Sequence, residues 1–372
     1  MLLLSEGVIR DVTTRTFYPG ILEALKLIHK SNHVLLVSNH AKPAWLTPEM
    51  NYIQYYRTTA RQNGDVVPRI IADNKDKQIV KSEIIVLGVA DADMHMASNS
   101  QTLLIRAAWA KLEANMAKYG VEWLDPATLP ALVDYLDDTG PWFFTSPAPF
   151  LDIYCLTSAG TKYESDKAYE RLATMMRWCL KDGQLALKSG LTLHLLSSIY
   201  ATAGFSDATK WGFYPSSGSG NDMSEIMSDF TKQAGHIFKK RVTQPLFIRH
   251  KASLKRHLGG SDRTDATTQV TTIHLNPHYE GKLKGHVVVV LDDFLTYGLS
   301  FGVAAAFLKK AGARKVIGVA MGKFGNRGNR YDIEILSDPF KPITKFRQGA
   351  VTSLSGTTDA TVKLKMLKKF KS

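Results

Sequence analysis

The sequence predicts an α/β protein with two domains, each built on a largely parallel β-sheet. Residues 287–291 are four valines and a leucine, a run typical of a strand buried on both faces, and a turn and a helix over 301–310 follow it. Three further apolar runs, at 2–4, 34–37 and 83–88, are separated by longer polar or helical stretches near the N-terminus. The chain has 372 residues, which is enough for two such sheets.

The N-terminal elements follow a strand-helix-strand order. Residues 19–29 predict a helix, because a proline stands near its start and apolar residues recur at helical spacing from Ile21 to Ile28. After the strand at 83–88 we expect a long helix through Leu103, Leu104, Ala107 and Leu112. These elements place a first domain at 1–115.

The rest of the chain divides into three parts. Residues 116–205 predict a mainly helical connecting region, with amphipathic helices at 167–180 and 185–199 and several prolines between 126 and 149. A second domain is expected at 206–350, and 351–372 form a basic tail.

Composition limits the class of protein. Hydrophobic residues make up 44% and charged residues 22%, which predicts folded cores and excludes wholesale disorder. The two cysteines, Cys155 and Cys179, lack a metal-site spacing, so we expect reduced thiols in a cytoplasmic protein without a membrane span. The net charge of +13 suits a polyanionic ligand, such as a phosphorylated substrate or a nucleic acid.

The strongest functional signal follows the strand at 287–291. Asp292 and Asp293 stand at its C-terminal end, where ligands bind in open α/β sheets. The next turn contains Thr296, Gly298 and Ser300, whose hydroxyls and backbone N–H groups, with the helix N-terminus, suit a phosphate. Because two carboxylates would repel a phosphate alone, the ligand should also carry hydroxyl groups or a metal ion.

This stretch resembles the ribose-phosphate loop of type I phosphoribosyltransferases, which reads Asp-Asp-x-x-Thr-Thr-Gly-x-Thr/Ser after a hydrophobic strand. Tyr297 departs from the pattern at the second threonine. The resemblance implies a parallel sheet, Mg²⁺ as cofactor, and phosphoribosyl pyrophosphate (PRPP) as a ligand. It implies that Asp292 and Asp293 hold the ribose hydroxyls and contact the metal only indirectly. The turn residues would wrap the 5′-phosphate; they are Leu295, Thr296, Tyr297, Gly298 and Ser300.

The order of the neighbouring parts extends the resemblance, most closely to the ComF-like branch of the family. A strand at 211–214 enters a Gly/Ser loop that resembles the pyrophosphate loop, with Ser216, Ser217 and Gly218 as binding residues, and a helix at 224–238 follows. A short strand at 245–249 leads into a basic segment, 250–269, that resembles the mobile loop of these enzymes. The candidates for contacting the leaving pyrophosphate are Arg249, Lys251 and Lys255.

The implied activity is that of a glycosyltransferase of nucleotide metabolism. It would transfer ribose 5-phosphate to or from a nucleobase or a related nitrogen nucleophile, with Asp292, Asp293, Arg249 and Lys251 as catalytic residues. Phe324, after a strand at 316–321, is a candidate for stacking on the base, and a core or lid position is the alternative.

The first domain resembles a small haloacid-dehalogenase-like domain with a Rossmann-type sheet. Ser38 falls at that family's second motif, and Asp91 or Asp93 falls near the acidic fourth motif that holds Mg²⁺. The family's nucleophile is an aspartate at the end of the first strand, where this chain has Leu4-Ser5-Glu6. The resemblance therefore implies a domain without that hydrolytic mechanism, serving as a scaffold, a partner surface or a binding module.

Two other functions remain open. A non-catalytic regulator or effector, in a stress or phage-defence setting, would use the same loop only to sense PRPP or a nucleotide. Direct nucleic-acid binding rests on charge, chiefly on the tail lysines Lys363, Lys365, Lys368, Lys369 and Lys371. We also expect a homo-oligomer, with a protein partner reached through the first domain.

Overall fold

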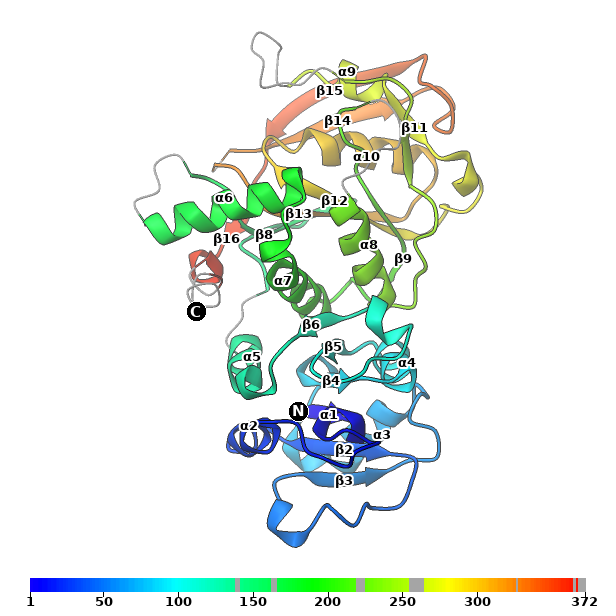
Figure 1. Cartoon of the computed structure of the whole chain (residues 1–372). Coiled ribbons are helices and arrows are strands. Elements are labelled where there is room, and N and C mark those ends of the chain that lie inside the picture. Colours follow the sequence, from blue (N-terminus) through cyan, green and yellow to red (C-terminus); the bar gives the residue numbers. More distant parts are fainter. Residues whose placement is uncertain are drawn as a thin grey trace. The chain divides into compact units, whose positions relative to one another are not determined.

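The computed structural model describes residues 1–137, 141–161, 166–218, 225–253, 264–325, 327–363 and 366. It is an α/β structure of two compact units, one comprising Met1–Thr139 with His236–Lys239 and the other Gly140–Gly235 with Lys240–Ser372 (Figure 1). The α/β class is confirmed. The predicted boundary at 115 lies too early, and 116–205 is not a separate helical region, because it supplies strands to both sheets.

The first unit contains a six-stranded sheet in which every strand pair is parallel. The strand order is β3-β2-β1-β4-β5-β6. The strands are β1 (Leu2–Leu4), β2 (Val34–Ser38), β3 (Gln54–Arg57), β4 (Ile85–Gly88), β5 (Leu103–Ala107) and β6 (Val121–Trp123). The three predicted N-terminal strands are confirmed, whereas the helix expected through Leu103 and Leu112 is wrong, since β5 pairs there with β4 and β6.

Helices follow the strands of this sheet. They are α1 (Glu6–Ile9), α2 (Ile21–Ile28), α3 (Val66–Asp73), α4 (Asp91–Ser100) and α5 (Leu129–Asp137), with short 3₁₀ turns at Pro48–Met50, Lys75–Lys77, Lys81–Glu83, Met116–Lys118 and Pro126–Thr128. Helices α3 and α4 bury apolar side chains against one face of the sheet, where Val66, Ile70 and Met94 pack with Leu3, Leu35 and Val86. The predicted helix at 19–29 is confirmed by α2.

The second unit contains a mixed sheet in the order β16-β7-β8-β13-β12-β9. Four neighbouring strands, β8 (Leu151–Ser158), β13 (Lys315–Lys323), β12 (Val287–Leu295) and β9 (Ala208–Phe213), are parallel. At the other edge, β7 (Phe144–Ser146) and β16 (Thr357–Thr358) run antiparallel. The valine run forms the first half of β12, and it is fully buried because β12 lies between β13 and β9.

Among the described residues, the second unit also has antiparallel strand pairs outside the main sheet, and further helices. The pairs are β10 (Phe247–Arg249) with β11 (Ile273–Leu275) and β14 (Asn329–Ile335) with β15 (Phe346–Ser353). The helices are α6 (Lys167–Asp182), α7 (Lys188–Ala201), α8 (Glu225–Ile237), α9 (Thr267–Val270) and α10 (Leu299–Lys310), with 3₁₀ turns at Leu185–Leu187 and Pro277–Tyr279. The helices predicted near 167, 185, 224 and 301 are therefore confirmed.

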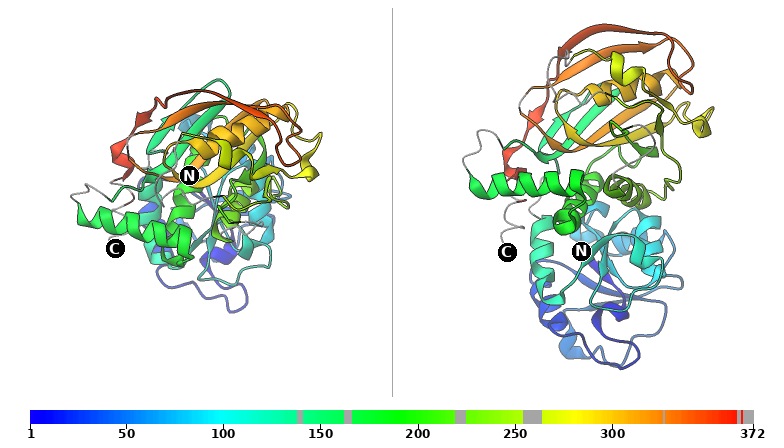
Figure 2. Two further views of the ribbon diagram at one scale, coloured as in Figure 1. Left: turned by 90° about the horizontal axis from the view of Figure 1, so that it is seen from above. Right: turned by 45° about the horizontal axis from the view of Figure 1, so that its top comes forward.

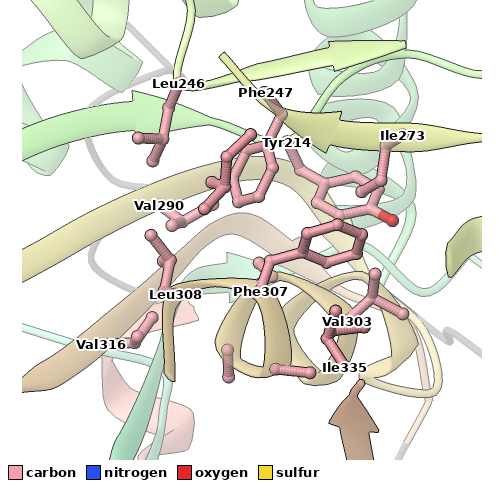
Figure 3. Packing of buried hydrophobic residues seen from close by; sticks show 14 of the residues in the cluster. Tyr214, Leu246, Phe247, Ile273, Val290, Val303, Phe307, Leu308, Val316 and Ile335 are labelled. Atoms are coloured by element: carbon pink, nitrogen blue, oxygen red, sulfur yellow. The ribbon is translucent and has the colours of Figure 1, made fainter. Parts of the chain in front are cut away.

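Helix α10 lies between the main sheet and the β14–β15 ribbon (Figure 2). Its residues Val303, Phe307 and Leu308 are fully buried in a cluster with Val290 of β12 and Ile335 of β14 (Figure 3). Gly302 permits the close approach of the ribbon, because a Cβ there would lie 3.0 Å from the Tyr331 side chain. The strand that carries the acid pair is thus packed against a rigid helix.

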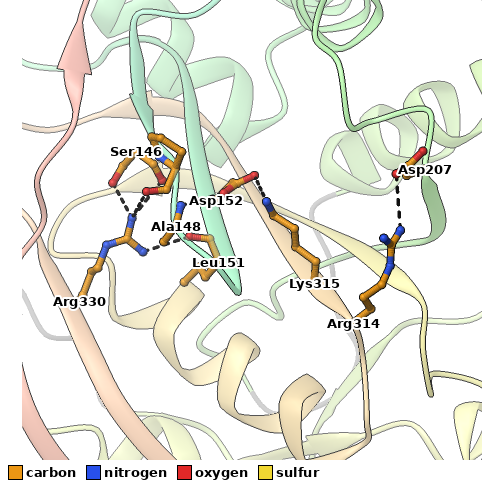
Figure 4. A network of polar contacts seen from close by, with 9 residues as sticks. Ser146, Ala148, Leu151, Asp152, Asp207, Arg314, Lys315 and Arg330 are labelled. Carbon is orange, nitrogen blue, oxygen red and sulfur yellow. Dashed lines mark hydrogen bonds and ion pairs between the residues drawn. The ribbon is translucent and has the colours of Figure 1, made fainter.

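Polar contacts fasten the amino-terminal edge of this sheet (Figure 4). The guanidinium of Arg330 donates to the carbonyl oxygens of Leu151 and Ser146, each at 3.0 Å. Lys315 pairs with Asp152 at 2.8 Å, which joins β13 to β8. These contacts lie at the opposite end of β13 from the acid pair.

Candidate functional site

The carboxyl ends of the four parallel strands meet along one edge of the second sheet. Residue Leu291 of β12 is paired with Phe213 of β9, and Asp292 is paired with Ala320 of β13. The backbone N–H of Tyr214 donates to the Leu291 carbonyl oxygen at 2.7 Å. The Gly/Ser loop after β9 therefore begins directly beside the acid pair, as the order of the sequence motifs predicts.

The turn from β12 into α10 depends on Gly298. This residue has φ +83° and is the N-cap of α10, and a Cβ there would lie 2.6 Å from the Asn329 carbonyl oxygen. The Asn329 N–H donates to the Tyr297 carbonyl oxygen at 2.9 Å, and the Phe324 N–H donates to that of Leu295 at 2.9 Å. The segment after β13 thus holds the turn in place, and the N-cap residue of α10, a glycine, has no side chain to bond the first N–H groups of the helix.

The turn encloses a cavity of about 330 Å³. This volume is within the range of small-molecule sites. The cavity is lined by Gln269, Asp292, Phe294, Leu295, Thr296, Tyr297, Gly298, Leu299, Ser300 and Phe301. Every predicted turn residue therefore reaches the cavity together with Asp292, and Gln269 of α9 was not predicted.

Asp292 is partly buried and is one of the residues that line this cavity. Burial raises its pKa to about 6, although Lys181, a hydrogen bond with Ser300 and the charge of Arg249 each lower it. One of its carboxylate oxygens accepts the backbone N–H of Asp293 at 2.9 Å. A desolvated carboxylate that faces an open cavity is stabilised by hydroxyl donors or by a cation.

Asp293 points to a different set of partners. It forms an ion pair with Lys181 of α6, whose side chain is 52% exposed. Burial lowers the pKa of Lys181, and Asp292 opposes that change. Helix α6 contributes a second cation, Arg177, which lies 5.7 Å from the centre of the Phe324 ring. Neither cation was predicted, because α6 precedes the acid pair by more than a hundred residues in sequence. Only the packing of α6 on the sheet brings its side chains close to the acid pair.

Phe324 lies beside Phe294, with ring centres 4.9 Å apart and planes inclined by 43°. Both rings are partly exposed. The loop that follows Phe324 is fastened by Lys323, whose buried ammonium donates to the carbonyl oxygens of Gly325 at 2.7 Å and Arg327 at 3.1 Å. Phe324 is therefore at the site edge, where a ring could stack against it.

Arg249 does not occupy the position predicted for it. Its side chain is 1% exposed, and it donates to the Thr272 hydroxyl at 2.6 Å, to the Gln269 side-chain oxygen at 3.0 Å and to the Pro215 carbonyl oxygen at 3.5 Å. The prediction that it contacts the leaving pyrophosphate directly is corrected, because those bonds direct the guanidinium inward. It instead ties the start of the Gly/Ser loop to α9.

The structure describes some of the other predicted binding residues and not all of them. Ser216, Ser217 and Gly218 lie in the loop after β9, and the Ser217 carbonyl oxygen accepts the N–H of Ser253 at 2.9 Å. Lys251 has an exposed side chain close to that link. Lys255, the centre of the basic segment and the tail beyond 366 lie outside the described residues.

The two candidate carboxylates of the first unit, Asp91 and Asp93, form hydrogen bonds within that unit. Asp93 is fully buried and accepts the Ser5 hydroxyl at 2.7 Å and the N–H groups of Val89 and Ala90 at 3.0 Å each, and it pairs with Arg61 at 3.0 Å. Both oxygens of Asp91 accept hydrogen bonds, from Asn115 and from the N–H of Met116. Ser38 accepts the N–H of His40 at 3.1 Å. Both carboxylates therefore have hydrogen-bond partners within the fold of the first unit.

In the described parts of the chain, no group of three or more His, Cys, Asp or Glu side chains is arranged to hold a metal ion. A Mg²⁺ ion held mainly by substrate oxygens needs only one or two carboxylates, and the desolvated Asp292 fits that requirement.

None of the helices in the described ranges is long and apolar enough to cross a membrane. Comparisons with protein-family models, curated proteins and solved structures found no match to this chain.

Proposed function

We propose that the second unit binds PRPP with Mg²⁺ and transfers its ribose 5-phosphate to or from a nitrogen nucleophile. The observation that supports this best is the path of the chain after β12. Two adjacent carboxylates stand at the end of a central parallel strand, and the chain then turns at Gly298 into the N-terminus of a twelve-residue helix beside a cavity. Carboxylates that are followed by the backbone N–H groups of a turn and a helix N-terminus suit a ligand that carries both hydroxyl groups and a phosphate.

Each part of the site has a task in this proposal. The backbone N–H groups of the turn and of the first residues of α10 hold the 5′-phosphate, since a helix N-terminus favours an anion. Asp292 and Asp293 accept hydrogen bonds from the ribose hydroxyls and favour the positive charge that develops on the sugar as pyrophosphate leaves. Bound Mg²⁺ neutralises the pyrophosphate. Arg249 positions the Gly/Ser loop for the leaving group.

The experiment is PRPP binding by calorimetry with Mg²⁺, together with pyrophosphate release across a panel of nitrogen-containing acceptors. We expect saturable binding and release with one class of acceptor. The double substitution of Asp292 and Asp293 by Asn should abolish binding while the unit stays folded. Glu280→Gln, which removes one exposed acid from the same unit, is the matched control and should bind normally.

The outcomes separate the competing functions. Binding without release for any acceptor would favour a regulator that only senses PRPP or a nucleotide. Wild-type affinity in the double variant would refute the site. Affinity for DNA or RNA that falls steeply with salt, in the absence of PRPP binding, would favour nucleic-acid binding instead.

A further inference from the structure

Helix α6 presents two cations to the edge of the site. Arg177 and Lys181 are four residues apart, so they lie on the same face of the helix. Arg177 lies over the ring of Phe324, and Lys181 lies over the ring of Phe294, each at 5.7 Å from the ring centre. Two aromatic rings and two cations therefore meet at the ends of β12 and β13.

The packing of α6 on the sheet holds these side chains in place. Met176 lies against Gly322 of β13, where a Cβ would be 2.8 Å from the end of the Met176 side chain and 3.1 Å from the Phe294 ring. Gly322 thus makes room for both the helix and the ring. The arrangement is built into the fold.

The two cations are not equally neutralised. Lys181 forms an ion pair with Asp293, which offsets its charge. Within the described ranges, Arg177 has no ion pair or hydrogen bond from its side chain, and its guanidinium is exposed over the Phe324 ring. Like charges one helical turn apart repel each other, so an anion between them would be stabilising.

The order of the strands shows which part of the ligand would meet Arg177. Strand β12 has β9 and its Gly/Ser loop on one side, and β13 with Phe324 on the other. In the proposed function, pyrophosphate lies on the β9 side of β12, next to the Gly/Ser loop. The acceptor then lies on the β13 side, next to Phe294, Phe324 and Arg177. An acceptor there would meet aromatic faces and a cation.

We propose that the acceptor is a planar nitrogen heterocycle that carries a carboxylate, with the ring against Phe294 and Phe324 and the carboxylate on Arg177. This inference rests on the proposed function. In the transfer, the nitrogen lone pair forms the bond to the anomeric carbon. The bond from that carbon to pyrophosphate breaks, its electron pair leaves with pyrophosphate, and any proton on the nitrogen passes to water.

The test uses the full chain with PRPP and Mg²⁺ and measures pyrophosphate release with matched acceptors. The pairs are pyridine-3-carboxylate against pyridine-3-carboxamide, pyridine-2,3-dicarboxylate against pyridine, and pyrimidine-2,4-dione-6-carboxylate against pyrimidine-2,4-dione. We expect a carboxylate to be the best acceptor. Arg177→Gln should lower its kcat/KM by about 10-fold to 100-fold, the effect of losing one charge-assisted hydrogen bond. The neutral acceptors and the Kd for PRPP should change little.

Arg171→Gln is the matched control, because it removes an exposed arginine from the same helix. It should leave release unchanged. If PRPP fails to bind the wild-type chain, the proposed function itself fails. If PRPP binds, the inference alone is overturned by a preference for neutral acceptors, by an equal loss for both members of a pair in Arg177→Gln, or by the absence of release with every carboxylate.

Discussion

Replacing Asp292 by Asn should make the second unit more stable at pH 8 while it weakens PRPP binding. The carboxylate has a pKa of about 6 in the folded chain, against 3.8 for an ordinary aspartate, because burial disfavours its charged form. This difference corresponds to about 3 kcal/mol of folding free energy that is lost when the group ionises. Asn has nearly the same shape, and its side-chain oxygen can still accept the Asp293 N–H.

The pH dependence follows from the direction of this pKa change. A carboxyl group with a raised folded-state pKa favours folding below about pH 4, where both states are protonated, and loses that advantage as pH rises through about 6. The wild-type chain should therefore become less stable relative to Asp292→Asn between pH 4 and pH 6, with a difference of up to about 3 kcal/mol at pH 8. PRPP affinity should rise over the same interval in the wild type, because the ribose hydroxyls favour the ionised carboxylate.

The assay exploits the two cysteines. Cys155 and Cys179 are free, buried and both in the second unit, and the sequence has no others. Urea unfolding read by thiol labelling with a dipyridyl disulfide, which reacts with thiols at acid as well as neutral pH, therefore reports the unfolding of that unit alone. A variant that is less stable than the wild type by the same amount from pH 4 to pH 8 would refute a desolvated carboxylate at this position.

Three further predictions concern the turn, the buried arginine and the first unit. Gly298→Ala should destabilise the second unit by about 2–4 kcal/mol in the thiol assay, because a Cβ would clash with the Asn329 carbonyl oxygen. Gly281→Ala, at φ +70° but with open space around it, should cost only about 1–2 kcal/mol, and equal losses would contradict the clash. Arg249→Lys should destabilise the second unit by about 2–3 kcal/mol in the same assay, since lysine lacks the planar guanidinium that bonds Thr272 and Gln269. An unchanged midpoint of urea unfolding would show that these bonds do not stabilise the unit. Asp93→Ala should cost about 3 kcal/mol or more in the first unit, measured by hydrogen exchange of β4, and unchanged protection there would show that its buried hydrogen bonds do not stabilise the unit.

The elements that sequence predicted well are those specified by neighbouring residues. The valine run of β12 and the acid pair after it are contiguous, so they could be placed at a strand end without knowledge of any partner. The helix α10 follows from the same local reasoning. Strand β5 shows the limit: Leu103, Leu104 and Ala107 have spacing compatible with a helix, and only pairing with β4 and β6 makes them a strand.

In the site, too, residues adjacent in sequence were predicted and residues from distant segments were not. The turn from Leu295 to Ser300 was predicted because its residues are adjacent in sequence. Lys181 and Arg177 come from a helix that precedes the acid pair by more than a hundred residues, and no local pattern connects the two. Arg249 was predicted to contact the leaving pyrophosphate because it ends a short strand. Its burial depends on Thr272 and Gln269, which a sequence alone does not place.

The fastening of the loop after β13 by Lys323 has a consequence for the entropy of binding. Lys323 is 3% exposed and its ammonium donates to the carbonyl oxygens of Gly325 and Arg327, so these two backbone positions near Phe324 are held before any ligand arrives. A ligand that stacks on Phe324 would not have to order these two positions, and ordering the backbone of one residue costs about 1–2 kcal/mol. Binding on this side should therefore depend little on conformational change, and its selectivity should come from the shape and charge of the ligand.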